Sequence, residues 1–204
     1  MGLNARGVRA SIVATMFALA LTIPAAAQNA APTLSRPALS RIHISNFGMI
    51  NASYYRGAQP KGRDYADLAA IGVKTVIDLT DDDGQASEPA MAQRAGMKSI
   101  KIPMSGHVPP TKEQLTKFMS IVNDPASQPV YVHCVGGKHR TGVMTAAYRM
   151  IHDGWTSNQA FAEMKNFKFG MDFLHPEFKQ FVFAFHPEPK GSVPPVLALE
   201  TPQQ

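Results

Sequence analysis

The chain has 204 residues, of which 20 are Lys or Arg and 15 are Asp or Glu, so its formal net charge is +5. No block of basic residues is long enough to indicate a nucleic-acid-binding stripe, which removes nucleic acid from the expected partners. The sequence contains one cysteine, Cys134, and a lone cysteine excludes an intrachain disulfide.

The N-terminal segment has the pattern of a signal peptide. Arg6 and Arg9 precede an apolar stretch from Ile12 to Ile23, and the small residues Ala25-Ala26-Ala27 follow as a cleavage site. The apolar stretch is shorter than the roughly 20 residues that a membrane-spanning helix needs. We therefore interpret residues 1–27 as a signal peptide, with an uncleaved anchor as the alternative. We expect a periplasmic or secreted protein with no stable membrane span after cleavage.

The rest of the chain divides into an extension, one domain and a tail. Residues 28–40 form the extension, and residues 41–185 are long enough to bury the core of a single domain. Residues 186–204 are rich in proline and have no apolar periodicity, so we predict a flexible tail.

Within the domain, short β-branched runs alternate with helical patterns. Strands are predicted at 75–79, 99–102 and 130–133, after a first strand and turn at 41–55; helices are predicted at 64–70, 89–95, 141–152, 157–166 and 176–185, with another that begins at Thr111. Thr111 and Gln114 form a capping-box pattern at the start of that helix. Strands that alternate with helices predict an α/β fold with a mainly parallel central sheet flanked by helices.

The strand Val130–His133 runs directly into the loop Cys134–Arg140, and a helix is predicted to follow at Thr141. Glycines in such a loop allow successive backbone N–H groups to face a bound anion, and the following helix adds its N-terminal N–H groups. Arg140 supplies a planar guanidinium that can hold two phosphoryl oxygens. The same positive surroundings lower the pKa of Cys134, so its thiolate can attack a bound phosphoryl group in line and form a cysteinyl-phosphate.

These residues resemble a known signature. His133-Cys134, Gly137 and Arg140-Thr141-Gly142 fit the pattern HC-x-x-G-x-x-R-S/T-G of protein tyrosine and dual-specificity phosphatases. The string from Gly137 to Gly142 is particularly similar to atypical dual-specificity phosphatases of plants and fungi, some of which act on inositol pyrophosphates. The stretches 46–49 and 54–60 resemble the N-terminal block of that group and of its bacterial relatives. The resemblance implies a phosphatase domain with a dual-specificity phosphatase-like fold.

The resemblance also implies a role for each residue of the signature. Cys134 would be the nucleophile, and Arg140 would clamp the phosphate. Thr141 would donate a hydrogen bond to the sulfur, and His133 would orient the loop and support the thiolate. The phosphate-binding residues would be Val135, Gly136, Gly137, Lys138, His139 and Arg140. Lys138 occupies a position that is also Lys in phosphoinositide-type phosphatases, and it favours a polyphosphorylated substrate.

The sequence departs from this family at the general acid. Such phosphatases usually carry an Asp in the loop that corresponds to residues 103–110, but this loop contains neither Asp nor Glu. His107 is the ionisable residue there, and its unperturbed pKa suits proton transfer. The acidic turn Asp81–Asp83 is a second source of a proton. A phosphoanhydride substrate, whose leaving group needs little protonation, is a third solution.

Other functions remain alternatives. Without the acid, the domain could be a phosphate-binding pseudophosphatase, and a rhodanese-like sulfurtransferase also places a cysteine on an anion-binding loop. The seven histidines show no H-E-x-x-H or comparable spacing, so we expect neither a metal site nor a cofactor. The expected partner is a phosphorylated protein or a small polyphosphorylated molecule.

Overall fold

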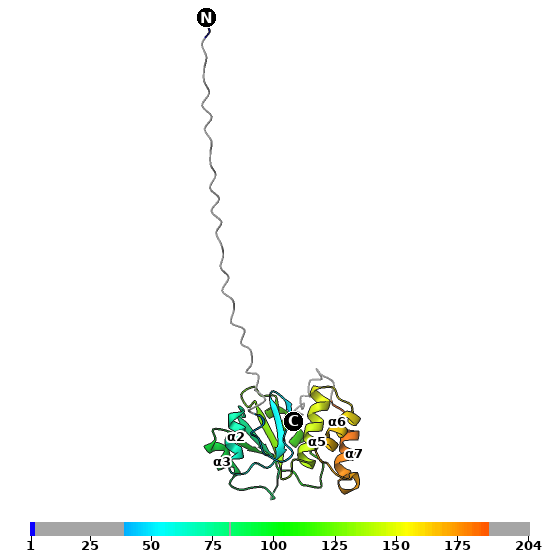
Figure 1. The fold of residues 1–204 in the computed structure, drawn as a ribbon. Coiled ribbons are helices and arrows are strands. Elements are labelled where there is room, and N and C mark those ends of the chain that lie inside the picture. Colours follow the sequence, from blue (N-terminus) through cyan, green and yellow to red (C-terminus); the bar gives the residue numbers. More distant parts are fainter. Residues whose placement is uncertain (3–38, 82, 188–204) are drawn as a thin grey trace, which may run out of the picture. The chain divides into compact units, whose positions relative to one another are not determined.

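The computed structural model describes residues 1–2, 39–81 and 83–187 (Figure 1). Almost all of the predicted signal peptide and extension, and the tail beyond residue 187, lie outside the described residues, so those assignments stay predictions. Within the described ranges, no helix has both the length and the apolar character that crossing a membrane requires.

A five-stranded sheet forms the centre of the domain. Its strands are β1 (Gly48–Asn51), β2 (Tyr54–Ala58), β3 (Thr75–Asp78), β4 (Lys98–Lys101) and β5 (Val130–Cys134), and they lie side by side in the order β1-β2-β5-β3-β4. β1 pairs with β2 in antiparallel fashion, whereas the other three pairs are parallel. The predicted α/β fold with a mainly parallel sheet is therefore confirmed.

The helices begin and end close to their predicted positions. They are α2 (Asp64–Ala70), α3 (Glu88–Arg94), α4 (Lys112–Val122), α5 (His139–His152), α6 (Ser157–Asn166) and α7 (Pro176–Ala184), with a short 3₁₀ turn, η1, at Asp172–Leu174. The capping box at Thr111 is present, because its hydroxyl accepts from the Gln114 N–H and the Gln114 side chain accepts from the Thr111 N–H. α5 begins at His139, two residues before the predicted start.

The segment 41–55 differs from the prediction of one strand and a turn. It contains all of β1 and the first residues of β2, separated by a turn in which the Ser53 N–H donates to Asn51 Oδ1 at 2.9 Å. This hydrogen bond closes a local Asx-type turn, which allows the chain to reverse direction between the two strands.

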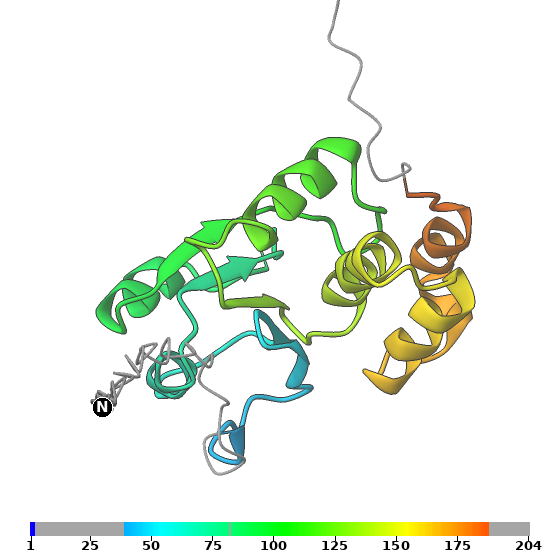
Figure 2. The ribbon, with the colours of Figure 1, turned by 90° about the horizontal axis from the view of Figure 1, so that it is seen from above.

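Helices cover both faces of the sheet, as Figures 1 and 2 show. Val130 and Val132 of β5 pack into one apolar core with residues of α4, α5, α6 and α7. Tyr131, which points to the opposite face, packs into a second core with residues of α2 and α3. Burial on both faces is typical of parallel sheets and explains the continuous apolar run that predicted β5.

The carboxyl ends of three parallel strands meet at one edge of the sheet. Ala58 of β2 is in register with Cys134 of β5, and Asp78 of β3 is in register with His133. The loops after these strands therefore lie next to one another, which is where α/β sheets usually bind their ligands.

Candidate active site

Cys134 is the last residue of β5, and its loop leads into α5 within four residues. The cysteine is free and only 4% exposed. It lines a cavity of about 320 Å³ together with Arg140, with Asp83 from the loop after β3, and with His107 from the loop after β4. The structure thus brings the predicted nucleophile, the predicted clamp and the predicted candidate acid to one cavity.

Gly137 fixes the shape of the phosphate loop. Its φ is +64°, and a Cβ at this position would lie 2.3 Å from the carbonyl oxygen of Gly57 and 2.6 Å from the nitrogen of Ala58. Only glycine fits this left-handed conformation against the backbone of β2. The Gly137 carbonyl points back into the protein, where it accepts hydrogen bonds from Arg56 Nη2 at 2.6 Å and from Asn46 Nδ2 at 2.7 Å.

Arg56 and Asn46 form a support beneath the loop. Arg56 lies in the middle of β2, is fully buried, and stacks its guanidinium 4.1 Å from the ring centroid of Phe167. Asn46 also donates to the Phe167 carbonyl at 2.8 Å, and so ties the end of α6 to the same support. Asn46 and Arg56 thus fix the orientation of the Gly137 carbonyl and hold the phosphate loop in place.

Opposing effects set the pKa of Cys134. Burial raises it, but the Thr141 hydroxyl and backbone N–H, the Arg140 charge and the Lys138 N–H together outweigh burial and bring the pKa below its ordinary value. Thr141 is fully buried in the first turn of α5, and its predicted hydrogen bond to the sulfur stays a prediction. The lowered pKa increases the share of thiolate, which is the form that nucleophilic attack requires.

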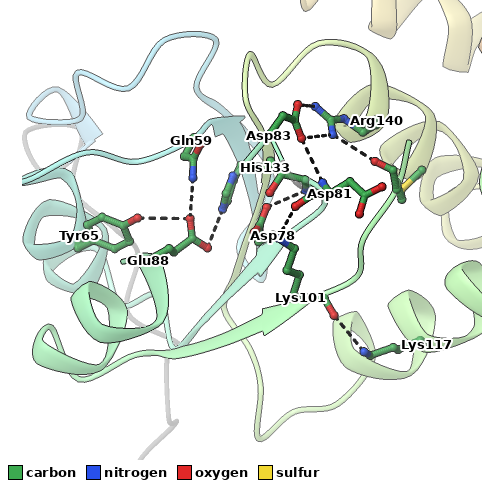
Figure 3. Close-up of polar contacts among 12 residues, drawn as sticks. Gln59, Tyr65, Asp78, Asp81, Asp83, Glu88, Lys101, Lys117, His133 and Arg140 are labelled. Carbon is green, nitrogen blue, oxygen red and sulfur yellow. Dashed lines mark hydrogen bonds and ion pairs between the residues drawn. The ribbon is translucent and has the colours of Figure 1, made fainter. Parts of the chain in front are cut away.

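Arg140 is held by a carboxylate that lies across the cavity (Figure 3). Its Nη1 donates to Asp83 Oδ1 at 2.9 Å and its Nη2 donates to Asp83 Oδ2 at 2.6 Å, while Nη1 also donates to the Met104 carbonyl at 3.2 Å. These hydrogen bonds from Arg140 lower the pKa of Asp83. Asp83 therefore occupies both terminal nitrogens of the guanidinium in this structure.

His133 does not reach the cavity but anchors β5 from behind. It is fully buried, and its Nε2 lies 3.1 Å from Oε1 of Glu88, at the start of α3. Glu88 is also buried, and its Oε2 accepts from Gln59 at 3.4 Å and from Tyr65 at 3.3 Å (Figure 3). The network fixes the position of the His133 side chain, and its predicted roles in orienting the loop and supporting the thiolate stay predictions.

The remaining predicted residues lie around the cavity. Val135, Gly136, Lys138 and His139 line it. His139 Nε2 lies 2.9 Å from the Phe169 carbonyl, and burial lowers the pKa of this imidazole. Lys138 is exposed and also lines a neighbouring cavity of about 480 Å³. The His107 side chain is 76% exposed. Its role as general acid stays a prediction.

Sequence reasoning missed Asn46, Arg56 and Glu88 as supporting residues, and it considered Asp83 only as a proton source. Asn46 and Arg56 lie within stretches that already resembled the phosphatases, and this was the available signal for them. For Glu88 the sequence offers no such signal, because its partner His133 lies 45 residues away.

The chain is similar to named phosphatases. It is 29% identical over 129 residues to the inositol diphosphatase SIW14 of Saccharomyces cerevisiae, a match that covers 61% of this chain and 46% of the yeast protein. It is 29% identical over 145 residues to the dual specificity protein phosphatase TpbA of Pseudomonas aeruginosa, covering 71% of this chain and 65% of TpbA. The chain thus spans less than two thirds of the length of either relative.

Solved structures show the same fold. The core catalytic domain of the PP-IP phosphatase SIW14 from S. cerevisiae superposes with a TM-score of 0.62 at 26% identity, over 70% of this chain and 87% of that one. P. aeruginosa TpbA superposes with a TM-score of 0.59 at 27% identity, over 68% and 83% of the two chains.

A family match covers most of the described domain. The family described as "DSP-PTPase phosphatase fused to NAD+ Kinase" matches residues 44–178, which include the support, the cysteine loop and the start of α7. The match spans well over half of the chain, and the chain therefore belongs to this DSP-PTPase phosphatase family.

Proposed function

We propose that this chain is a cysteine-dependent phosphatase that hydrolyses phosphate monoesters or phosphoanhydrides. The observation that carries the proposal is the Cys134 thiol, whose pKa is lowered and which lines one cavity with Arg140. A thiolate facing a bound phosphoryl group that is fixed by a guanidinium is placed for in-line displacement.

The reaction has two steps. The Cys134 thiolate attacks phosphorus, the bond from phosphorus to the leaving oxygen breaks, and that oxygen takes a proton or departs as an anion. Water then attacks the cysteinyl-phosphate, the S–P bond breaks, and phosphate leaves while the sulfur returns to the thiolate. Arg140 and the loop N–H groups stabilise the charge on the phosphoryl oxygens in both steps.

His107 is the proposed proton donor for substrates with a poor leaving group. It lines the cavity that contains Cys134, and it lies in the loop that joins β4 to α4. Its exposed position allows it to turn toward a substrate, since apo structures often hold such groups away from their reacting position.

The neighbouring cavity favours a substrate with several phosphates. It is lined by Lys61, Lys138 and Lys168 and shares Val135, Gly136 and Lys138 with the catalytic cavity. Three ammonium groups next to one phosphate site attract further anionic groups. The names of the relatives fit two substrate classes, because SIW14 is an inositol diphosphatase and a TpbA variant has been solved in complex with phosphotyrosine.

The test is phosphate release from a phosphotyrosine peptide, a phosphoinositide and an inositol pyrophosphate, with Cys134→Ser as the blank. We expect turnover by the natural chain, none by Cys134→Ser, and a preference for the inositol pyrophosphate that weakens in Lys61→Met and Lys168→Met. Undiminished phosphate release by Cys134→Ser would overturn the assignment. Phosphate binding without turnover would identify a pseudophosphatase, and transfer of sulfur from thiosulfate to cyanide would identify a sulfurtransferase.

We also propose that the enzyme is exported and acts in the periplasm or outside the cell. The support is the basic, apolar and small-residue pattern of residues 1–27. Cell fractionation with intact mass measurement tests this: we expect a soluble exported form that begins near Gln28. Recovery of the full-length mass in the membrane fraction would favour the uncleaved anchor.

A further inference from the structure

Two histidines and a glutamate meet beside the catalytic cavity. His107 lies in the loop before α4, whereas His175 and Glu177 lie at the start of α7, so the group joins two segments far apart in the sequence. Oε1 of Glu177 is 3.2 Å from Nδ1 of His175 and 3.8 Å from Nδ1 of His107. One potential ligand atom from each of the three residues lies within 4.8 Å of the other two.

These separations match the ligand spacing of a zinc site. With bonds of about 2.0–2.2 Å and tetrahedral angles, two zinc ligands lie roughly 3.4 Å apart. The two distances to Glu177 bracket this value. The His107 ring stacks on the His175 ring with centroids 5.1 Å apart, and because the His107 side chain is 76% exposed, a rotation of this side chain can close the remaining gap. Two histidines and one carboxylate leave a fourth position for water or a phosphate oxygen.

Local packing restricts the side chains of His175 and Glu177. The His175 ring lies 3.7 Å from the ring centroid of His139 and 6.2 Å from that of Phe169. Its side chain is only 15% exposed, and the Glu177 side chain is 22% exposed. Both are therefore largely ordered before an ion arrives, which reduces the entropy that binding would cost.

We propose that His107, His175 and Glu177 form a binding site for a divalent transition-metal ion such as zinc, and that the bound ion inhibits the phosphatase. His107 and His175 line the same cavity as Cys134 and Arg140. An ion bound there would link the loop before α4 to the start of α7 beside this cavity. It would also coordinate the imidazole of His107, the candidate proton donor. The sequence prediction of no metal site rested on spacing along the chain, which cannot reveal ligands 68 residues apart.

Zinc binding is measured by competition with a chromophoric chelator and by calorimetry on the folded chain. We expect one zinc ion per chain, with affinity reduced at least about tenfold in Glu177→Gln and in His175→Ala. His186→Ala removes an exposed histidine two residues after the end of α7 and serves as the matched control, with zinc affinity unchanged. Equal affinity in all four proteins would overturn the site.

The catalytic thiol is a competing zinc ligand, and a second variant separates the two. Cys134→Ser should retain the zinc ion if His107, His175 and Glu177 bind it. Loss of the ion in Cys134→Ser, with retention in Glu177→Gln, would instead assign the metal to the thiolate and refute the proposal.

The inhibition rests on the proposed phosphatase activity, whereas the binding does not. We expect zinc to inhibit phosphate release reversibly and EDTA to restore it. Glu177→Gln should need at least about tenfold more zinc for inhibition, measured relative to its own zinc-free rate. Zinc bound without any change in rate would refute the regulatory part alone. An inactive chain that still binds zinc through these residues would refute only the phosphatase assignment.

Discussion

Replacing Gly137 with alanine should damage both the stability of the domain and its phosphate loop. The new methyl group would lie 2.3 Å from the Gly57 carbonyl oxygen and 2.6 Å from the Ala58 nitrogen, and both atoms belong to the backbone of β2. Neither can move aside as a flexible side chain would, because β2 is hydrogen-bonded to β5 along its length. The loop must therefore shift at Gly137 itself.

The magnitude follows from two costs. Holding alanine at a φ of +64° costs about 1–2 kcal/mol, and forcing a methyl into a packed backbone contact costs about 1–3 kcal/mol. Alanine also restricts the unfolded chain, which returns about 0.4–1 kcal/mol of stability. The net expected loss in the free energy of unfolding is about 1–5 kcal/mol.

Gly136→Ala is the matched control. A Cβ on Gly136 would contact only the Lys138 side chain, at 3.6 Å or more, and the Gly136 φ lies outside the left-handed region. This variant gains the same restriction of the unfolded chain without strain, so we expect its unfolding free energy to stay within about 1 kcal/mol of the natural chain. Urea unfolding of the three proteins gives the comparison directly.

The displacement of the loop in Gly137→Ala should also reduce activity. Displacing the Gly137 carbonyl weakens its hydrogen bonds from Arg56 and Asn46, and so changes the direction of the loop N–H groups. We expect kcat/KM for p-nitrophenyl phosphate to fall more in Gly137→Ala than in Gly136→Ala. Equal unfolding free energies and equal rates for the two variants would refute this account of the loop.

Three further predictions concern the groups around the loop. Because the pKa of Cys134 is lowered, the pH midpoint of its inactivation by iodoacetamide should lie below that of a free cysteine. Thr141→Val should move this midpoint upward. Glu88→Gln should lower the free energy of unfolding by about 1–3 kcal/mol, because buried donors lose a charged acceptor. The exposed Glu113→Gln is the control and should change this free energy by about 0.5 kcal/mol or less, with both variants measured by urea unfolding. Arg140→Lys should reduce kcat/KM by at least about 100-fold, since one ammonium cannot hold both Asp83 and a phosphoryl group. The exposed Arg94→Lys is the control and should leave kcat/KM unchanged. Near-normal kcat/KM in Arg140→Lys would show that the guanidinium geometry is unimportant.

Most regular elements could be predicted because their signals are local. The helix after Thr111 is set by a capping box within four residues, and β5 is a short apolar run. β2 was only partly anticipated, since Tyr54–Ala58 includes a buried arginine and a glycine that no strand pattern favours. Its place in the sheet comes from pairing with β5, more than 70 residues later. Such pairing leaves little trace in the local sequence.

The candidate site divides in the same way. The cysteine loop could be predicted because its residues are contiguous and their chemistry depends on that spacing. Its supports could not, because each is a contact between distant residues: Asp83 with Arg140 across 57 positions, and Arg56 with Gly137 across 81. The buried supporting role of Glu88 could not be predicted either, since a glutamate in the first turn of a helix is ordinarily placed there by the helix dipole and remains solvated.

The ion pair between Asp83 and Arg140 narrows the choice of general acid. A general acid must carry a proton before the leaving group departs, but both oxygens of Asp83 accept hydrogen bonds from Arg140, and these lower the pKa of Asp83. Asp83 therefore stays ionised and positions the guanidinium instead of donating a proton. Of the alternatives, protonation by His107, which lines the cavity, and a leaving group that departs without a proton do not depend on Asp83. A phosphoanhydride has a leaving group that departs without a proton. The lack of Asp and Glu in the loop 103–110 and the lysines around the neighbouring cavity therefore favour the same polyphosphorylated class of substrate.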